Sequence, residues 1–402
     1  MTTRSLYICY LTLADPLVRT QVVAYLAGLT ERGHKIHLLT FETELSRARR
    51  RQLRAEMAAL GIQWHGLRYH KRPSLPATIY DTFAGAAAAT WLVRRHRLEV
   101  VHARSHVPLA MALLGRPLAR ARIIFDIRGL LADEYADAGR WAREGAPNRL
   151  TTWIQDVGLR RANGFVVLTD AVRRQLWGHQ KPPKYLQVIP CCVDFARLAP
   201  GDADVRVELG IGDGPLMIYV GKLTGVYMDR EMADFFATAR RARPELKLLV
   251  LTQSPADSII EELRRAHVPE NAYRVTSAAA GEVGDYLAAA DFAICFCHPK
   301  PSLVAASPTK IGEYLAAGLP VVSGPRVGDT DTILREERAG VVLTDFTDAA
   351  YARAATEILA LADDPASRAR CREVAERVFS LRNVGIPRYD ALYRQLAAVD
   401  RT

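Results

Sequence analysis

A repeated alternation of short apolar segments with longer helical stretches constrains the fold of this chain most. Residues 5–11 have the apolar character of a buried strand, residues 17–32 have helical spacing and end before Gly33, and residues 35–41 form a second predicted strand. A strand, a helix and a strand within about forty residues indicate a parallel sheet flanked by helices. The alternation continues in further predicted strands, at residues 99–102, 123–126 and 164–169.

A second series of the same kind follows a break in the pattern. Turn formers cluster in Pro200-Gly-Asp202 and Gly212-Asp-Gly-Pro215, as expected for a linker. Beyond them we predict strands at residues 216–221, 246–251, 273–275, 292–296, 320–322 and 340–343, and a helix at residues 372–400. We therefore predict an α/β protein with two Rossmann-like, wound parallel-sheet domains that face a ligand cleft at the carboxyl ends of their strands.

The composition is that of a folded protein without a membrane-spanning segment. The 402 residues are 49% hydrophobic and 24% charged, which excludes a disordered chain and is enough for two cores. No apolar run reaches the roughly 18 residues that span a bilayer, and the first ten residues lack signal-peptide features. The six cysteines include no C-x-x-C pair and no zinc-type spacing. We expect buried free thiols in a cytoplasmic protein.

Positive charge is concentrated in the first half of the chain. Residues 1–200 hold 30 Lys and Arg against 15 Asp and Glu, whereas residues 201–402 hold 24 against 29. This asymmetry predicts an anionic partner for the first domain. One predicted helix has four arginines at helical spacing, Arg47, Arg50, Arg51 and Arg54. They indicate that the protein binds peripherally to the inner face of an anionic membrane. The alternative is a solvated helix packed on the sheet. Nucleic acid is not expected, because no stacking aromatics are interleaved with these arginines.

The common motifs for binding a nucleotide phosphate are missing from the start of the chain. The turn after the first strand, at residues 12–19, lacks the glycines of G-x-G-x-x-G. No P-loop motif occurs anywhere in the sequence. These two absences argue against a dinucleotide oxidoreductase and against a P-loop ATPase.

A later segment offers a different kind of phosphate site. We expect Ser307 to cap a helix that has Pro308 at its first position and ends at Gly318. The free N–H groups of the first turn, together with Lys310, would bind a diphosphate. Glu313, one turn later, would accept hydrogen bonds from a ribose diol. An ordinary capped helix in a wound sheet explains the same residues equally well.

The same segment carries a family resemblance. Lys310-Ile-Gly-Glu-Tyr-Leu-Ala-Ala-Gly-Leu-Pro-Val-Val322 resembles the nucleotide-binding motif of GT-B glycosyltransferases, specifically the retaining family 4. Other segments are similar to that family's motifs and occur in the expected order, at Val188-Ile-Pro-Cys-Cys-Val-Asp194, Tyr219-Val-Gly-Lys-Leu223 and residues 283–291. The resemblance spans nearly the whole chain and is more specific in the C-terminal half. It implies an acceptor-side domain at residues 1–198, a nucleotide-sugar domain at residues 199–384, and a tail, 385–402, that packs back on the first domain.

The resemblance also implies roles for individual residues of the donor domain. Lys222 lies where the family places a cation against the donor phosphates. Tyr227 occupies the place of the usual second cation, so Arg230 is the nearest candidate. The predicted diphosphate site comprises Lys222, Arg230, Thr309, Lys310 and Ile311. Glu313 matches the ribose ligand, and the predicted base site comprises Thr276, Ser277 and Ala278.

One departure from the family concerns the donor sugar. The family motif is E-x7-E, and its first acid, which contacts the sugar, is replaced here by Ala305. Lys300 and Ser302 are the polar residues nearby that take over the sugar site in our interpretation. The resemblance implies a nucleotide-diphosphate sugar as donor substrate, with no cofactor and no metal required.

On the acceptor side, polar residues follow two predicted strands. The family often has a histidine after the strand that corresponds to residues 123–126, where this chain has Asp126 and Arg128. His102 and His106 follow another strand and are further candidates for the catalytic side of the cleft. A structural Asp–Arg pair and structural histidines are the alternatives.

These observations predict a retaining glycosyltransferase that uses a UDP-sugar in preference to a GDP-sugar. The expected acceptor is a hydroxyl of a glycan, a lipid-linked molecule or a small molecule, in envelope polysaccharide or glycoconjugate synthesis. A sugar-nucleotide epimerase and a non-catalytic nucleotide-sugar-binding protein are the alternatives.

Overall fold

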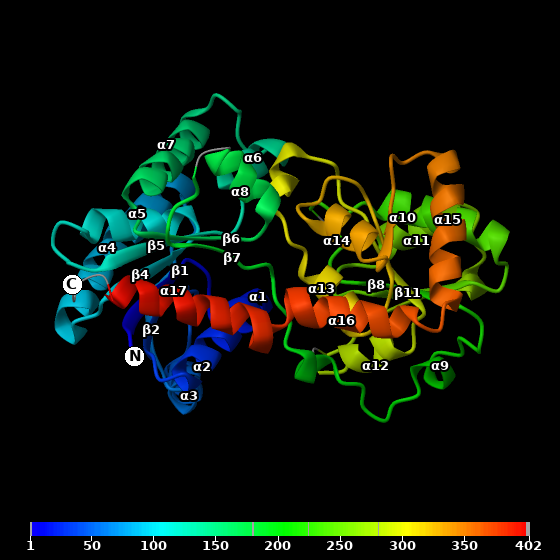
Figure 1. Ribbon diagram of the computed structural model, residues 1–402, viewed down its shortest axis with the longest axis horizontal. Helices are drawn as coiled ribbons and strands as arrows, with labels where there is room; N and C mark the ends of the chain where they lie inside the picture. The colour runs from blue at the N-terminus through cyan, green and yellow to red at the C-terminus, as the bar shows by residue number, and fades with distance from the viewer. Residues whose placement is uncertain (1, 179–180, 224, 280, 399–402) are drawn as a thin grey trace. The chain divides into compact units, whose positions relative to one another are not determined.

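The chain folds into two α/β units, each built on a parallel sheet. The computed structural model describes residues 2–178, 181–223, 225–279 and 281–398. Unit 1 joins residues 1–190 to residues 381–402, and unit 2 consists of residues 191–380 (Figure 1). The division therefore falls between residues 190 and 191 and between residues 380 and 381, a little before the predicted boundaries at 198/199 and 384/385.

Unit 1 is centred on a seven-stranded parallel sheet with the strand order β3-β2-β1-β4-β5-β6-β7. Its strands are β1 (Arg4–Cys9), β2 (Lys35–Glu42), β3 (Ile62–Arg68), β4 (Val100–Arg104), β5 (Arg122–Ile127), β6 (Gly164–Val167) and β7 (Leu186–Val188). The central strands are buried along almost their whole length, because helices cover both faces of the sheet. The edge strands β3 and β7 were not predicted. They are less buried and carry a weaker apolar signal.

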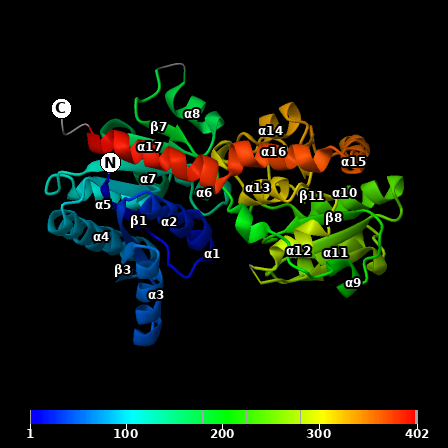
Figure 2. The same ribbon diagram turned by 60° about the horizontal axis from the view of Figure 1, so that its bottom comes forward.

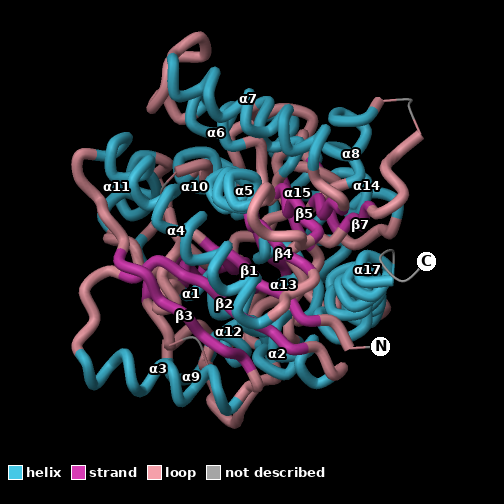
Figure 3. Tube along the Cα trace, turned by 90° about the vertical axis from the view of Figure 1, so that its left-hand side faces the viewer, coloured by secondary structure: helices cyan, strands magenta, loops and turns pink. Residues whose placement is uncertain are grey.

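The helices of unit 1 divide between the two faces of this sheet. They are α1 (Pro16–Val18), α2 (Ala24–Glu31), α3 (Arg47–Ala59), α4 (Ser74–His96), α5 (His106–Gly115), α6 (Leu131–Asp137), α7 (Ala146–Arg161), α8 (Asp170–Trp177) and α17 (Ile386–Ala398). The chain moves from β1 to β3 in one direction and then returns to β4 on the other side of β1. Right-handed crossovers therefore place α2 and α3 on one face and α4 and α5 on the other (Figure 3).

The C-terminal helix belongs to unit 1, although the chain has by then passed through unit 2. Residues 372–398 do not form the single helix predicted at residues 372–400, whose last two residues lie outside the described part of the chain. The structure has α16 (Ser367–Phe379), a π-helical turn at Leu381–Gly385 and then α17, with the break at Ser380. Helix α17 packs on α2 (Figure 2). At this contact, Gly28 leaves room for the side chain of Ile386.

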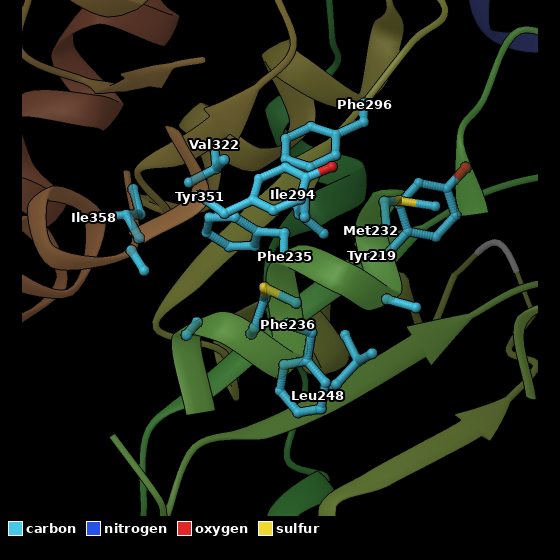
Figure 4. Packing of buried hydrophobic residues seen from close by; sticks show 14 of the residues in the cluster. Tyr219, Met232, Phe235, Phe236, Leu248, Ile294, Phe296, Val322, Tyr351 and Ile358 are labelled. Carbon is cyan, nitrogen blue, oxygen red and sulfur yellow. The ribbon is translucent and has the colours of Figure 1, made fainter. Parts of the chain in front are cut away.

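Unit 2 has a six-stranded parallel sheet with the strand order β10-β9-β8-β11-β12-β13. Its strands are β8 (Leu216–Val220), β9 (Lys247–Leu251), β10 (Tyr273–Thr276), β11 (Phe292–Cys295), β12 (Val321–Ser323) and β13 (Gly340–Val342). Its helices are α9 (Val205–Glu208), α10 (Asp229–Ala242), α11 (Asp257–Arg265), α12 (Val283–Ala288), α13 (Thr309–Ala316), α14 (Thr330–Glu336), α15 (Asp348–Asp363) and α16. In the core between the sheet, α10 and α15, the rings of Phe235 and Phe296 meet edge to face at 5.6 Å (Figure 4).

Two sequence expectations concern the whole chain. All six cysteines are free and buried, as predicted. Among the described residues, no helix combines the length and the apolar character needed to cross a membrane. The two wound parallel sheets confirm the predicted fold class.

Candidate active site

In unit 2, the start of helix α13 differs by one residue from the prediction. The helix begins at Thr309, and Pro308 is the capping residue, with an extended ψ of 122°. Ser307 is therefore not the cap, because its hydroxyl accepts a hydrogen bond from the N–H of Cys191 at 3.1 Å instead. The backbone N–H groups of Thr309 and Lys310 have no partner among the described residues. The first turn of α13 thus keeps two donors available to an anion.

Lys310 has its ammonium group in an aromatic recess rather than in solvent. Its side chain is 6% exposed, and its Nζ donates a hydrogen bond to the Tyr219 hydroxyl at 2.9 Å. The same Nζ lies 3.5 Å from the ring centroid of Tyr227 and 4.2 Å from that of Tyr219. Lys310 has no ion pair with a carboxylate among the residues described. Burial lowers its pKa, because the recess disfavours the charged form.

The loop after β8 is tied to the same recess. The Tyr219 hydroxyl, which accepts from Lys310, donates to the carbonyl oxygen of Lys222. Gly221 has a φ of +130°, and a β-carbon there would come within 2.9 Å of the Lys310 Nζ. The structure therefore brings the Lys222 loop and Lys310 together, while the side chain of Lys222 itself is exposed. Arg230 is also exposed, on the first turn of α10.

Glu313 lies one turn along α13 from Lys310, and the first-turn residue Ile311 between them is 1% exposed. The Glu313 carboxylate is half-buried and has no hydrogen-bond or ion-pair partner among the described residues. Burial raises its pKa, and the nearby charges of Lys310 and Arg197 act in the opposite direction. A carboxylate held near two cations without a direct partner is suited to accept hydrogen bonds from a ligand diol.

The remaining donor-side candidates lie on loops. Thr276 ends β10, and Ser277 and Ala278 follow it, with the Ala278 carbonyl oxygen accepting from the Gln253 side chain at 3.1 Å. Lys300 is exposed, whereas Ser302 is 5% exposed in the short 3-10 turn Pro301–Ala305. Ala305 is fully buried in that turn. The residue at the position of the family's first acid, Ala305, is therefore packed in the interior of unit 2.

In unit 1, Asp126 and His102 meet in an internal network. Both side chains are fully buried, and the His102 Nε2 lies 3.2 Å from the Asp126 Oδ2. The hydroxyls of Tyr7 and Tyr389 donate to the same oxygen at 3.4 and 3.3 Å, and the Tyr393 hydroxyl lies 2.9 Å from the His102 Nδ1. Two of these tyrosines are on α17. The network therefore joins the carboxyl end of the sheet to the returning C-terminal helix.

The charge of Asp126 is stabilised in this network. Burial by itself would raise the pKa of Asp126, but the Arg128 guanidinium, 3.7 Å away, and the hydrogen bond to His102 outweigh it and lower the pKa to about 2. His106 lies apart from this group, at the start of α5, with its Nε2 3.0 Å from the Gln155 Oε1. Burial lowers the pKa of His106 to about 4, so its ring is neutral at pH 7.

Helix α3 places its predicted basic residues unequally. Arg47, Arg51 and Arg54 are exposed, whereas Arg50 turns toward the sheet, donates to the Gly66 carbonyl oxygen at 2.9 Å and lies over the Trp64 ring. The apolar residues of the helix, Leu53 and Met57, are fully buried in unit 1. The exposed surface of α3 is therefore basic but not apolar.

Sequence reasoning missed the tyrosines that organise both groups. Tyr219 was noted only as part of a strand motif, and Tyr389 and Tyr393 only as part of a helical tail. The spacing of the latter two, four residues apart on one helix, was the available signal. Among the described residues, no cluster of three or more His, Cys, Asp or Glu side chains could hold a metal ion.

Comparisons with known proteins agree with this architecture. Two family models match the sequence: Glycosyltransferase Family 4 over residues 18–197 and Glycosyl transferases group 1 over residues 214–361. A comparison with curated protein sequences gave no match.

Solved structures match over nearly the full chain. A glycosyltransferase from Rickettsia africae is 12% identical, with a TM-score of 0.72 over 98% of each chain. HepE from Anabaena, in complex with UDP, is 13% identical, with a TM-score of 0.70 over 99% of this chain and 100% of that chain. Sucrose-phosphate synthase from Thermosynechococcus elongatus is 17% identical, with a TM-score of 0.67 over 99% of this chain and 98% of that chain.

Two wound parallel sheets and the two matching family models together define a glycosyltransferase of the GT-B type. The chain is a glycosyltransferase: the Glycosyltransferase Family 4 model matches most of its N-terminal half and the Glycosyl transferases group 1 model matches most of its C-terminal half, which is consistent with family 4.

Proposed function

We propose that this enzyme is a retaining glycosyltransferase that takes a sugar from a nucleotide-diphosphate sugar, with UDP preferred to GDP. The acceptor in this proposal is a hydroxyl of a glycan, a lipid-linked molecule or a small molecule, in envelope polysaccharide or glycoconjugate synthesis. The observation that carries the proposal is that a buried ammonium, Lys310, and a carboxylate without a partner among the described residues, Glu313, both lie on the first turns of α13. That HepE was solved with UDP supports a uridine nucleotide as donor.

The donor site neutralises the leaving diphosphate. The free N–H groups of Thr309 and Lys310 and the Lys310 ammonium supply positive potential at one place. Lys222 adds an exposed cation on the loop after β8, and Arg230 adds one on the first turn of α10. Glu313 takes the ribose hydroxyls, and residues 276–278 take the base. These groups bind and orient the donor, and they stabilise the charge that develops as the bond to the sugar breaks.

The sugar and acceptor contacts follow the same assignment. Lys300 and Ser302 hold the donor sugar in place of the acid that Ala305 lacks. Because Asp126 and His102 are fully buried, we assign them to positioning the Arg128 guanidinium rather than to contact with the acceptor. His106 is 1% exposed, so we also assign its neutral imidazole to positioning, through the Gln155 side chain, rather than to contact with the acceptor. The proposal calls for no metal and no cofactor besides the donor. We place the enzyme in the cytoplasm, where the exposed arginines of α3 attract it to an anionic membrane.

A binding experiment on Glu313 tests the donor assignment. UDP, GDP and a panel of their sugars are added to the protein, and thermal stability and donor hydrolysis are measured. We expect UDP to raise the Tm more than GDP does, and Glu313→Gln to weaken UDP binding on the order of 10-fold, because a hydrogen bond to a charged acceptor is lost. The matched control is Glu336→Gln, an exposed residue of α14, which should leave UDP binding unchanged. A protein that responds to no nucleotide, or a Glu313→Gln variant that binds UDP normally, contradicts the proposal.

A further inference from the structure

An ordinary amphipathic helix buries its large apolar residues. Helix α4 in unit 1 instead buries mainly small residues and exposes several large apolar ones. Its buried face is built mainly from small residues, Ala77, Gly85, Ala86 and Ala89. A β-carbon at Gly85 would come within 2.5 Å of the Met111 sulfur, so the helix packs closely on α5 there. Leu92 and Val93 are the large apolar residues that it buries. Three others face outward, where Ile79, Phe83 and Trp91 are 44%, 61% and 60% exposed. Packing within unit 1 does not explain why these side chains are large and apolar.

These side chains form the wall of a groove between α4 and the end of α5. Ile79, Phe83, Ala87 and Trp91 recur every four residues along α4. Phe83, Ala87 and Trp91 line a groove of about 760 Å³ together with Leu114 and Leu118, which come from α5 and the turn after it. Leu114 and Leu118 are 47% and 65% exposed. A groove lined by exposed aromatic and leucine side chains is an apolar surface that lacks a partner within the part of the chain that the structure describes.

The rim of the groove is positively charged. Arg94 and Arg95, on the last turn of α4, line the groove and are exposed. Arg97 and Arg120 are exposed close by in the sequence, and Arg116 lies in the turn after α5. The acidic residue of α4, Asp81, is fully buried and hydrogen-bonded to Tyr10 and His70, so it adds no negative charge to this surface. Aromatic and leucine side chains beside arginines match an interface of acyl chains and anionic headgroups.

We propose that this α4–α5 groove docks on an anionic lipid bilayer. Phe83, Trp91 and Leu118 enter the interfacial region, while Arg94 and Arg95 contact the phosphate groups. A second copy of this chain fits less well, because two such grooves meeting face to face would bring their arginine rims together. The surface is distinct from α3, which lies on the opposite face of the seven-stranded sheet (Figure 3). The inference therefore needs neither the α3 arginines nor the nucleotide assignment.

Vesicle co-sedimentation tests this docking surface. The full-length protein is mixed with vesicles of phosphatidylcholine alone or with 30% phosphatidylglycerol, a fraction on the order of that in anionic membranes. The variants are Phe83→Ser with Trp91→Ser, Arg94→Ser with Arg95→Ser, and, on the opposite face, Arg47→Ser with Arg51→Ser and Arg54→Ser. Val207→Ser, an exposed apolar residue of α9, controls for the loss of apolar surface elsewhere. Donor hydrolysis and circular dichroism are measured for each variant.

We expect binding to the anionic vesicles to fall at least 10-fold in both α4 variants, and to fall less in the α3 variant. In high salt the arginine variant and the wild type should converge, whereas the aromatic variant should remain weaker, because salt screens only the charge. Unchanged donor hydrolysis in the α4 variants separates this result from a failure of the nucleotide proposal. The inference would be overturned if the variant with Phe83→Ser and Trp91→Ser bound the anionic vesicles as strongly as the wild type does. It would also be overturned by a dimer in lipid-free solution that this variant dissociates, since the groove would then join two copies.

Discussion

The two units each hold a buried charged group, and among the described residues only the group in unit 1 has an ion-pair partner of opposite charge. The Asp126 carboxylate has His102, two tyrosine hydroxyls and the Arg128 guanidinium around it. In unit 2, the Lys310 ammonium has a tyrosine hydroxyl and two aromatic rings but no carboxylate, and Glu313 on the same helix has no partner among the described residues. The Asp126 network therefore stabilises the fold of unit 1. In unit 2, Lys310 and Glu313 carry opposite charges that a ligand could bind.

This difference has an energetic meaning. A buried ion that is fully paired recovers most of its desolvation cost, and removing one member of the group strands the others. A buried ion without a counter-ion leaves that cost unrecovered until an anion binds. Substitutions in unit 1 should therefore act on folding, and substitutions around Lys310 should act on binding.

The largest effect is expected for Asp126→Asn. This change removes the negative charge that faces Arg128, and it weakens the hydrogen bond that the Tyr389 hydroxyl of α17 donates to the side chain of residue 126. We expect the free energy of unfolding to fall by about 3 kcal/mol, as for other buried pairs that lose one partner. Urea denaturation measures it. The exposed pair of Asp133 with Arg143 supplies the matched control, since Asp133→Asn should change stability by less than about 0.5 kcal/mol.

The same variant gives a pH signature that distinguishes charge from packing. The pKa of Asp126 is lowered from 3.8 to about 2 in the folded protein, so its stabilising contribution is complete above pH 4 and is lost as the pH falls through 2. The difference in stability between the wild type and Asp126→Asn should therefore narrow between pH 4 and pH 2. A difference that stays constant over this range would assign the effect to packing.

A smaller effect, on binding rather than folding, is expected for Lys310→Met. The apolar side chain fills the aromatic recess without a buried charge, so the unliganded variant should be as stable as the wild type or more stable by about 1 kcal/mol. The rise in Tm caused by UDP should largely disappear, because the diphosphate loses its buried cation. Lys247→Met, on the first residue of β9, is the matched control and should keep the response to UDP. If the Lys310→Met variant were destabilised and its Tm still rose with UDP, Lys310 would act on folding, as Asp126 does, and not on binding.

Features of the two units that depend on a local sequence pattern could be predicted from the sequence. The alternation of strands and helices predicted both wound sheets, and the motif around Lys310 and Glu313 predicted that both residues lie on the first turns of one helix. The sequence could not show the burial of Asp126 and His102, because their partners Tyr389 and Tyr393 are more than 260 residues away along the chain. Nor could it show that Arg50 turns inward, since its partner is a backbone carbonyl on β3. These contacts depend on the tertiary path of the chain and have no local signature.

The smallest effect is expected at the crossover that leads into unit 2. Ser307→Ala removes the acceptor for the Cys191 N–H and leaves the backbone donor of this buried residue without this hydrogen bond. The expected loss of stability is about 1 kcal/mol by urea denaturation, the typical net value of one hydrogen bond. Thr356→Ala on α15 is the matched control, because its hydroxyl bonds only within its own helix, to the Ala352 carbonyl oxygen, and its loss should change stability by less than about 0.5 kcal/mol. If Ser307 were the helix cap, Ser307→Ala would also weaken α13 and, with it, the binding of UDP. The contact with Cys191 instead predicts that Ser307→Ala lowers stability and leaves UDP affinity unchanged, since the donors of the proposed diphosphate site belong to Thr309 and Lys310.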